Sequence, residues 1–288
     1  LSHQRVMLWA TSSAVSMSEG NVGVGYNSLS ANTSGSSNTA VGLDALILNT
    51  TGSNNSALGA NALDANTTGS RNSAFGVGAL DENTTGTNNT ATGYRSLRLN
   101  TTASNNTAFG YQSLLSNTTG TQNVAVGALA LDANTTATGN SALGYASLGA
   151  NTTGANHTAV GNHSLNANTT GNNNTALGQN SLLVNTTGSQ NTAVGALSLD
   201  ANTTASGNTA VGYGALSENT TGDLCTAVGA SALTSNVTGQ GNTAVGNNAL
   251  EDNTGHSNTA VGNRASYENT SGRDNVAIGN NSLNKNTT

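Results

Sequence analysis

The chain has 288 residues, a net charge of −6 and one lysine, Lys285; only 7% of its residues are charged, 3% are aromatic and none is proline. This composition lacks the basic surface that binds nucleic-acid phosphates and the varied surface in which enzymes form a pocket. We therefore expect no nucleic-acid partner, no enzymatic activity and no cofactor. No apolar stretch is long enough to cross a bilayer, so we expect no membrane span.

Residues 1–20 do not follow the pattern that fills the rest of the chain. Val6, Met7, Leu8 and Trp9 form its most hydrophobic stretch. A stack of strands exposes unpaired backbone groups at its ends, and natural proteins cover or use such ends. We therefore predict that residues 1–20 are an N-terminal cap or an inter-subunit plug. In the second case they would cover the C-terminal coil of another subunit and produce a head-to-tail filament.

Residues 21–288 consist of sixteen copies of a 17-residue unit, N-T-A-V-G-x-x-A/S-L-x-x-N-T-T-G-x-x. Among the fifteen copies that precede the last, only the copy that begins at Asn242 is shorter, by one residue, and the printed sequence ends fourteen residues into the last copy. Strict spacing of this kind indicates that each copy forms the same turn of structure and contacts mainly its neighbours. The copies begin at Asn21, Asn38, Asn55, Asn72, Asn89, Asn106, Asn123, Asn140, His157, Asn174, Asn191, Asn208, Cys225, Asn242, Asn258 and Asn275.

Within each unit, the T-A-V stretch alternates in the manner of a short strand. We expect the second and fourth places to face the interior together, and the third-place alanine to face another chain. The fifth-place glycine, present in every copy, predicts a corner with positive φ. Alanine or serine at the eighth place and leucine at the ninth predict a second short strand. The unit therefore predicts an all-β fold, a parallel β-solenoid or β-roll of about sixteen coils.

The triplet N-T-T, N-T-S or N-V-T recurs at the twelfth place and has two interpretations. It is formally an acceptor for N-linked glycans. Alternatively, the asparagines point inward and their amides form a ladder from coil to coil. Asn253 keeps the amide without the acceptor pattern, which favours the ladder, and sugars on adjacent threonines are compatible with it. The candidates are Asn32, Asn49, Asn66, Asn83, Asn100, Asn117, Asn134, Asn151, Asn168, Asn185, Asn202, Asn219, Asn236, Asn269 and Asn286.

Other columns carry weaker signals. Acidic residues gather at the tenth and eleventh places and predict a solvated edge. The four histidines have no metal-ligand spacing and no catalytic triad is suggested, so we expect no metal site and no catalytic residue. Cys225 stands in a column of asparagines and is interpreted as a tolerated substitution, with an intermolecular thiol link as the alternative.

Two alternative functions come from exposed columns. Regular threonines at the second, thirteenth and fourteenth places suggest ice binding as one alternative function. The thirteenth and fourteenth places are adjacent, however, and adjacent side chains in a strand face opposite ways, which weakens this interpretation. Tyrosines at the sixth place form a discontinuous file that suits either a carbohydrate-binding adhesin or a simple surface. They are Tyr26, Tyr94, Tyr111, Tyr145 and Tyr213.

The motifs N-V-A-V-G at Asn123 and N-V-A-I-G at Asn275 resemble the S-V-A-I-G-type repeats in the heads of trimeric autotransporter adhesins, and similar repeats in phage and viral fibres. The resemblance covers residues 21–288. It implies a parallel β-roll, often trimeric and left-handed, on a cell or virion surface. We expect an extracellular structural fibre that serves as surface filament, adhesin shaft or matrix element. Its expected partners are further copies of itself, joined head-to-tail, laterally or as a trimer, and glycans or a host surface.

Overall fold

The computed structural model describes residues 20–286. The chain divides into two compact units, the first ending at Asn123 and the second beginning at Val124. No helix occurs in residues 20–286, and each unit is a parallel β-solenoid whose coils lie about 17 residues apart. The predicted fold class is confirmed. The predicted cap or plug, with Val6, Met7, Leu8 and Trp9, lies outside the described residues.

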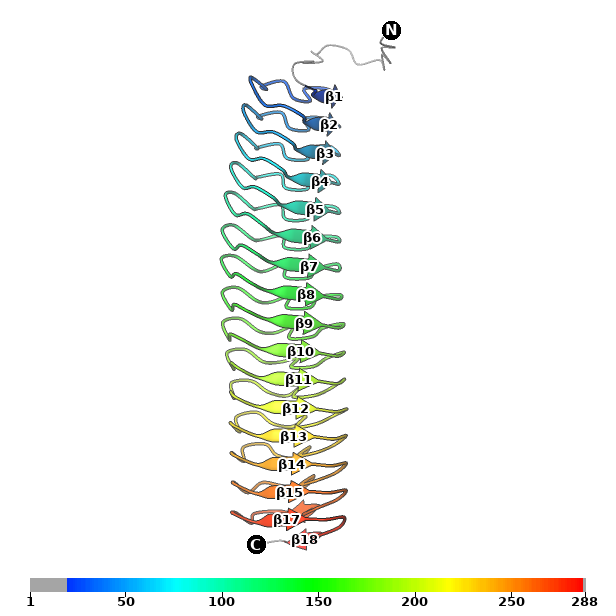
Figure 1. Ribbon diagram of the computed structural model, residues 1–288, viewed down its shortest axis with the longest axis vertical. Coiled ribbons are helices and arrows are strands. Elements are labelled where there is room, and N and C mark those ends of the chain that lie inside the picture. The colour runs from blue at the N-terminus through cyan, green and yellow to red at the C-terminus, as the bar shows by residue number, and fades with distance from the viewer. Residues whose placement is uncertain (1–19, 287–288) are drawn as a thin grey trace. The chain divides into compact units, whose positions relative to one another are not determined.

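The first unit contributes one three-residue strand per coil to a parallel sheet (Figure 1). Neighbouring strands come from successive repeats and pair in register, so that Ala40 lies opposite Ala57. Equivalent residues of successive copies therefore form straight columns. The strands are β1 (Val22–Val24), β2 (Thr39–Val41), β3 (Ser56–Leu58), β4 (Ser73–Phe75), β5 (Thr90–Thr92) and β6 (Thr107–Phe109).

The second unit repeats this arrangement, and its short copy stays in register. Thr243 lies opposite Thr259, sixteen residues later, because the deletion falls in the loop after Asn253. The strands are β7 (Val124–Val126), β8 (Ser141–Leu143), β9 (Thr158–Val160), β10 (Thr175–Leu177), β11 (Thr192–Val194), β12 (Thr209–Val211), β13 (Thr226–Val228), β14 (Thr243–Val245), β15 (Thr259–Val261) and β17 (Val276–Ile278).

The fifth-place glycines form the predicted corner. Each has a φ between 118° and 143°, which side chains rarely tolerate. Space is equally restrictive, since a Cβ on Gly212 would lie 2.5 Å from the carbonyl oxygen of Gly229 in the next coil. Glycine is therefore required at this place both by the backbone conformation and by the close approach of successive coils.

The third-place alanines face the interior, opposite to the predicted orientation. Ala193 is fully buried, whereas second- and fourth-place side chains reach solvent in both units. At Gly23, a Cβ would lie 3.1 Å from Ser28 Oγ and 3.8 Å from Leu29 Cδ1, so third-place methyl groups contact the eighth and ninth residues. The coil has room for a methyl group there, but not for valine. The prediction that the aliphatic fourth-place column fills the core is wrong, and the alanine column is not available for lateral contacts.

The predicted second strand at the eighth and ninth places is also wrong. These residues lie in a turn, in which Leu199 is buried with a φ of 51° and donates its N–H to Ala215 O of the next coil at 3.0 Å. Left-handed residues recur at the seventh, ninth and seventeenth places, and they bend the coil while backbone groups still bond to adjacent coils. In residues 20–286 a second sheet occurs only between β16 (Glu268–Asn269) and β18 (Lys285–Asn286).

Candidate functional site

The twelfth-place asparagines form the predicted ladder inside the coil. Asn49 Nδ2 donates to Asn32 Oδ1 at 2.8 Å and to Gly52 O at 3.0 Å, and Asn66 Nδ2 donates to Asn49 Oδ1 at 2.8 Å. The candidates from Asn49 to Asn269 are fully buried, while Asn32 and Asn286 are partly exposed. Each inner amide therefore has its hydrogen-bonding groups satisfied by the neighbouring coils and by its own turn.

The ladder bears directly on N-linked glycosylation at these asparagines. Both hydrogens of Asn66 Nδ2 are donated, one to Asn49 Oδ1 and one to Gly69 O at 3.0 Å. A glycan on this nitrogen would replace one of those donors and would have to fit inside a coil whose asparagine is 0% exposed. The fourteenth-place threonines, by contrast, are exposed from Thr51 to Thr238.

A second asparagine ladder occupies the first place of the unit, and the sequence analysis did not predict it. Asn38 N–H donates to Asn21 Oδ1 at 2.8 Å, and Asn38 Nδ2 donates to Gly52 O at 2.8 Å. Gly52 O also accepts from Asn49, so this one carbonyl joins the two ladders in its coil. The signal was present in the sequence, since asparagine occupies this place in all copies except those with His157 and Cys225.

His157 takes over the ladder bonds of the asparagine that it replaces. Its Nδ1 accepts the N–H of Asn174 at 3.1 Å, as the Oδ1 of a first-place asparagine does for the next copy, and its ring also bonds to the backbone of Gly171. An accepting Nδ1 requires the neutral ring with its proton on Nε2. Burial lowers the pKa of His157 to about 4, because desolvation penalises the charged ring more than the backbone contact with Gly171 favours it.

Cys225 substitutes for asparagine less completely. Its N–H donates to Asn208 Oδ1 at 2.8 Å and its thiol lies 3.2 Å from Gly239 O. The side chain is fully buried, and desolvation is the main cause that raises the pKa of the thiol. These contacts support the interpretation of Cys225 as a tolerated substitution.

The outward face of the sheet is formed by the second and fourth places. Side chains such as Leu58 and Phe109 are 50% and 57% exposed. No charged residue occupies either place in any of the sixteen copies. This face is therefore a neutral surface of hydroxyl, methyl and larger apolar groups in straight columns.

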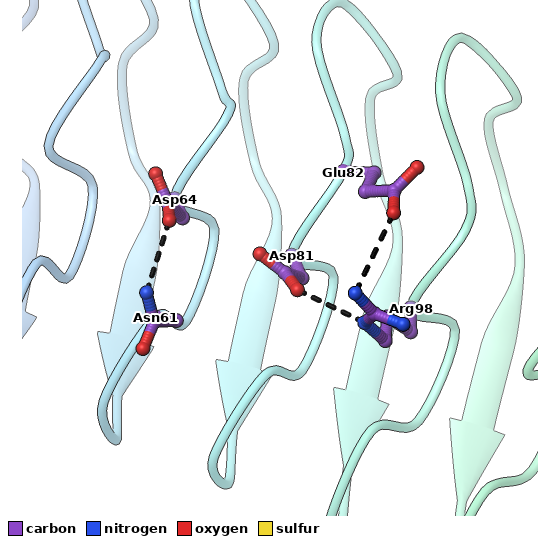
Figure 2. A network of polar contacts seen from close by, with 5 residues as sticks. All are labelled: Asn61, Asp64, Asp81, Glu82 and Arg98. Carbon is purple, nitrogen blue, oxygen red and sulfur yellow. Dashed lines mark hydrogen bonds and ion pairs between the residues drawn. The ribbon is translucent and has the colours of Figure 1, made fainter.

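The tenth and eleventh places carry the predicted acidic edge, and Figure 2 shows its best-defined part. Arg98 Nε lies 3.0 Å from Asp81 Oδ2 and its Nη2 lies 3.7 Å from Glu82 Oε1, while Asn61 donates to Asp64 at 3.0 Å. Partial burial is the main cause that raises the pKa of Asp64. Within residues 20–286, no group of three histidine, cysteine, aspartate or glutamate side chains could hold a metal ion.

The sixth-place tyrosines lie beside the glycine corner and are exposed. Tyr94 and Tyr111 stack with ring centroids 5.7 Å apart and an interplanar angle of 13°, and the Arg95 guanidinium lies 5.1 Å from the centroid of Tyr94. Stacking covers one face of each ring. A planar ligand could therefore stack only on the ring faces that point away from the other tyrosine.

Comparison with protein-family models finds no match, and comparison with curated proteins finds none either. Among the described residues, no helix is long and apolar enough to cross a membrane.

Proposed function

We propose that this chain is a structural element of an extracellular fibre or filament at a cell or virion surface, and that it has no enzymatic activity. The observation that carries the proposal is the pair of buried asparagine ladders in each unit. Within a unit they bond neighbouring coils to one another through side chains as well as backbone. Such nearest-neighbour bonding suits a protein whose role is to extend and to resist unfolding.

Lateral self-association is part of this proposal, and the first unit supplies the surface for it. Leu58, Phe75 and Phe109 are between 41% and 57% exposed on the outward face. Burying the exposed half of such side chains contributes about 1 kcal/mol each. Because this face carries no charge, a second copy presenting the same face is a suitable partner.

Electron microscopy and sedimentation velocity of the full chain test the proposal. We expect ordered side-by-side assemblies that dissociate when Leu58→Asp, Phe75→Asp and Phe109→Asp are combined. The matched control adds three aspartates at exposed fourteenth-place threonines of the same unit, Thr68→Asp, Thr85→Asp and Thr102→Asp, and should still assemble. Native protein that stays monomeric at all concentrations would contradict lateral association. Intact mass measurement of native material would reveal any attached sugars.

A further inference from the structure

Seven consecutive strands of the second unit, β9 to β15, present an unusually regular outward surface. Each carries threonine at the second place and valine or leucine at the fourth, and all are paired in register. We call these fourteen side chains the threonine array. They are Thr158, Thr175, Thr192, Thr209, Thr226, Thr243 and Thr259 with Val160, Leu177, Val194, Val211, Val228, Val245 and Val261.

The geometry of the array is that of a lattice. Neighbouring strands of a sheet lie about 4.8 Å apart, and residues i and i+2 of one strand lie about 6.6 Å apart. Hydroxyl-bearing and methyl-bearing columns therefore run in parallel over about 30 Å. The third-place alanines beneath them are fully buried, so the array rests on a packed interior.

The chemistry of the array leaves it open to water. Thr192 and Thr209 reach solvent, and Val211, Val228, Val245 and Val261 are each 36% or 37% exposed. Within the described part of the chain, the array hydroxyls form no hydrogen bond to the protein, whereas the thirteenth-place hydroxyls donate to the next coil, as Thr186 does to Thr203 O at 3.0 Å. The second-place hydroxyls are thus free to bond to solvent.

Exposed methyl groups restrict the orientation of first-shell water, and hydroxyl groups fix water by hydrogen bonds. A rigid lattice of both would order water in two dimensions with the regular repeat of the sheet, about 4.8 Å across the strands and about 6.6 Å along them. The neutrality of the array matches the neutrality of ice, and its regularity distinguishes it from the first unit, where Ser56, Phe75 and Thr92 interrupt the columns. We propose that the threonine array is an ice-binding face.

This inference does not depend on the proposed fibre function, since the two use different strands. Freezing hysteresis and enrichment in a slowly growing ice hemisphere are measured on the full chain. We expect both activities in the native protein, and we expect them to fall to the level of buffer when Thr192→Lys and Thr209→Lys are combined at the centre of the array.

The matched control carries Thr187→Lys and Thr204→Lys at exposed fourteenth-place positions of the neighbouring loops, with the same change in charge. It should retain native activity, and circular dichroism of both variants checks that they fold. Absence of hysteresis and of ice enrichment in the native protein would overturn the proposal. So would equal loss in the two variants, or a native dimer that only the array variant dissociates, because the array would then be covered by a second copy.

Discussion

Replacement of His157 by asparagine should make the stability of the second unit less sensitive to acid. The pKa of His157 falls from 6.5, the value of the unhindered side chain, to about 4 in the folded protein. Above pH 6.5 the ring is neutral in both states and imposes no penalty. Between pH 6.5 and pH 4 the unfolded chain binds a proton that the folded chain does not. The free energy of unfolding therefore decreases as the pH is lowered through this range. At about 1.4 kcal/mol per pKa unit, the loss approaches about 3 kcal/mol near pH 4.

Urea unfolding of the native protein and of His157→Asn, followed by circular dichroism between pH 7.5 and pH 4, measures this effect. Both proteins carry the same carboxylates, so the difference between their unfolding free energies isolates the ring. We expect the native protein to lose about 3 kcal/mol relative to the variant over this range. His163→Asn removes a histidine from a half-buried place outside the ladder and serves as the control. A native-minus-variant difference that stays constant from pH 7.5 to pH 4 would refute the reasoning.

Three further predictions concern single residues. Asn202→Ala removes the bonds to Asn185 Oδ1 at 2.7 Å and Ala205 O at 3.1 Å and should cost at least about 3 kcal/mol in urea unfolding, while Thr204→Ala at the surface should change stability by less than about 0.5 kcal/mol. Gly212→Ala places a Cβ against a backbone oxygen and should lower the thermal unfolding midpoint sharply. Gly214→Asn is the control, because the φ there is 61° and no atom lies nearer than 4.0 Å to the added Cβ, so the midpoint should stay nearly unchanged. Equal effects of the two substitutions would contradict the requirement for glycine at the fifth place. Burial raises the pKa of the Cys225 thiol, so a thiol reagent should modify it only after denaturation, and rapid labelling of the folded protein would show that the coil opens there.

The period, the glycine corner and the twelfth-place ladder were all predictable from the sequence. The corner and the ladder each depend on a residue type with few alternatives. Only glycine tolerates both the φ of Gly212 and the close approach of Gly229. Asparagine combines a hydrogen-bond donor and an acceptor in one short side chain. The first-place ladder was predictable in principle by the same reasoning, since it is nearly as regular.

The direction in which the strand faces was not predictable, because alternation fixes which residues share a face but not which face is inside. The larger side chains were expected within, yet a coil filled by the ninth-place leucines and two asparagine columns leaves room only for alanine. The turn at the eighth and ninth places was missed because leucine seldom adopts the left-handed conformation of Leu199.

Cysteine pairs test most directly the claim that successive copies stack in parallel, one repeat apart. In a Cys225→Asn background, Thr175→Cys with Thr192→Cys places two thiols on directly paired residues of adjacent strands, at about 4.8 Å between Cα atoms, within the range of a disulfide. Thr175→Cys with Thr209→Cys places them two strands apart, beyond that range. We predict an intramolecular disulfide in the first pair and none in the second; oxidation of the second pair in preference to the first would contradict the stacked register.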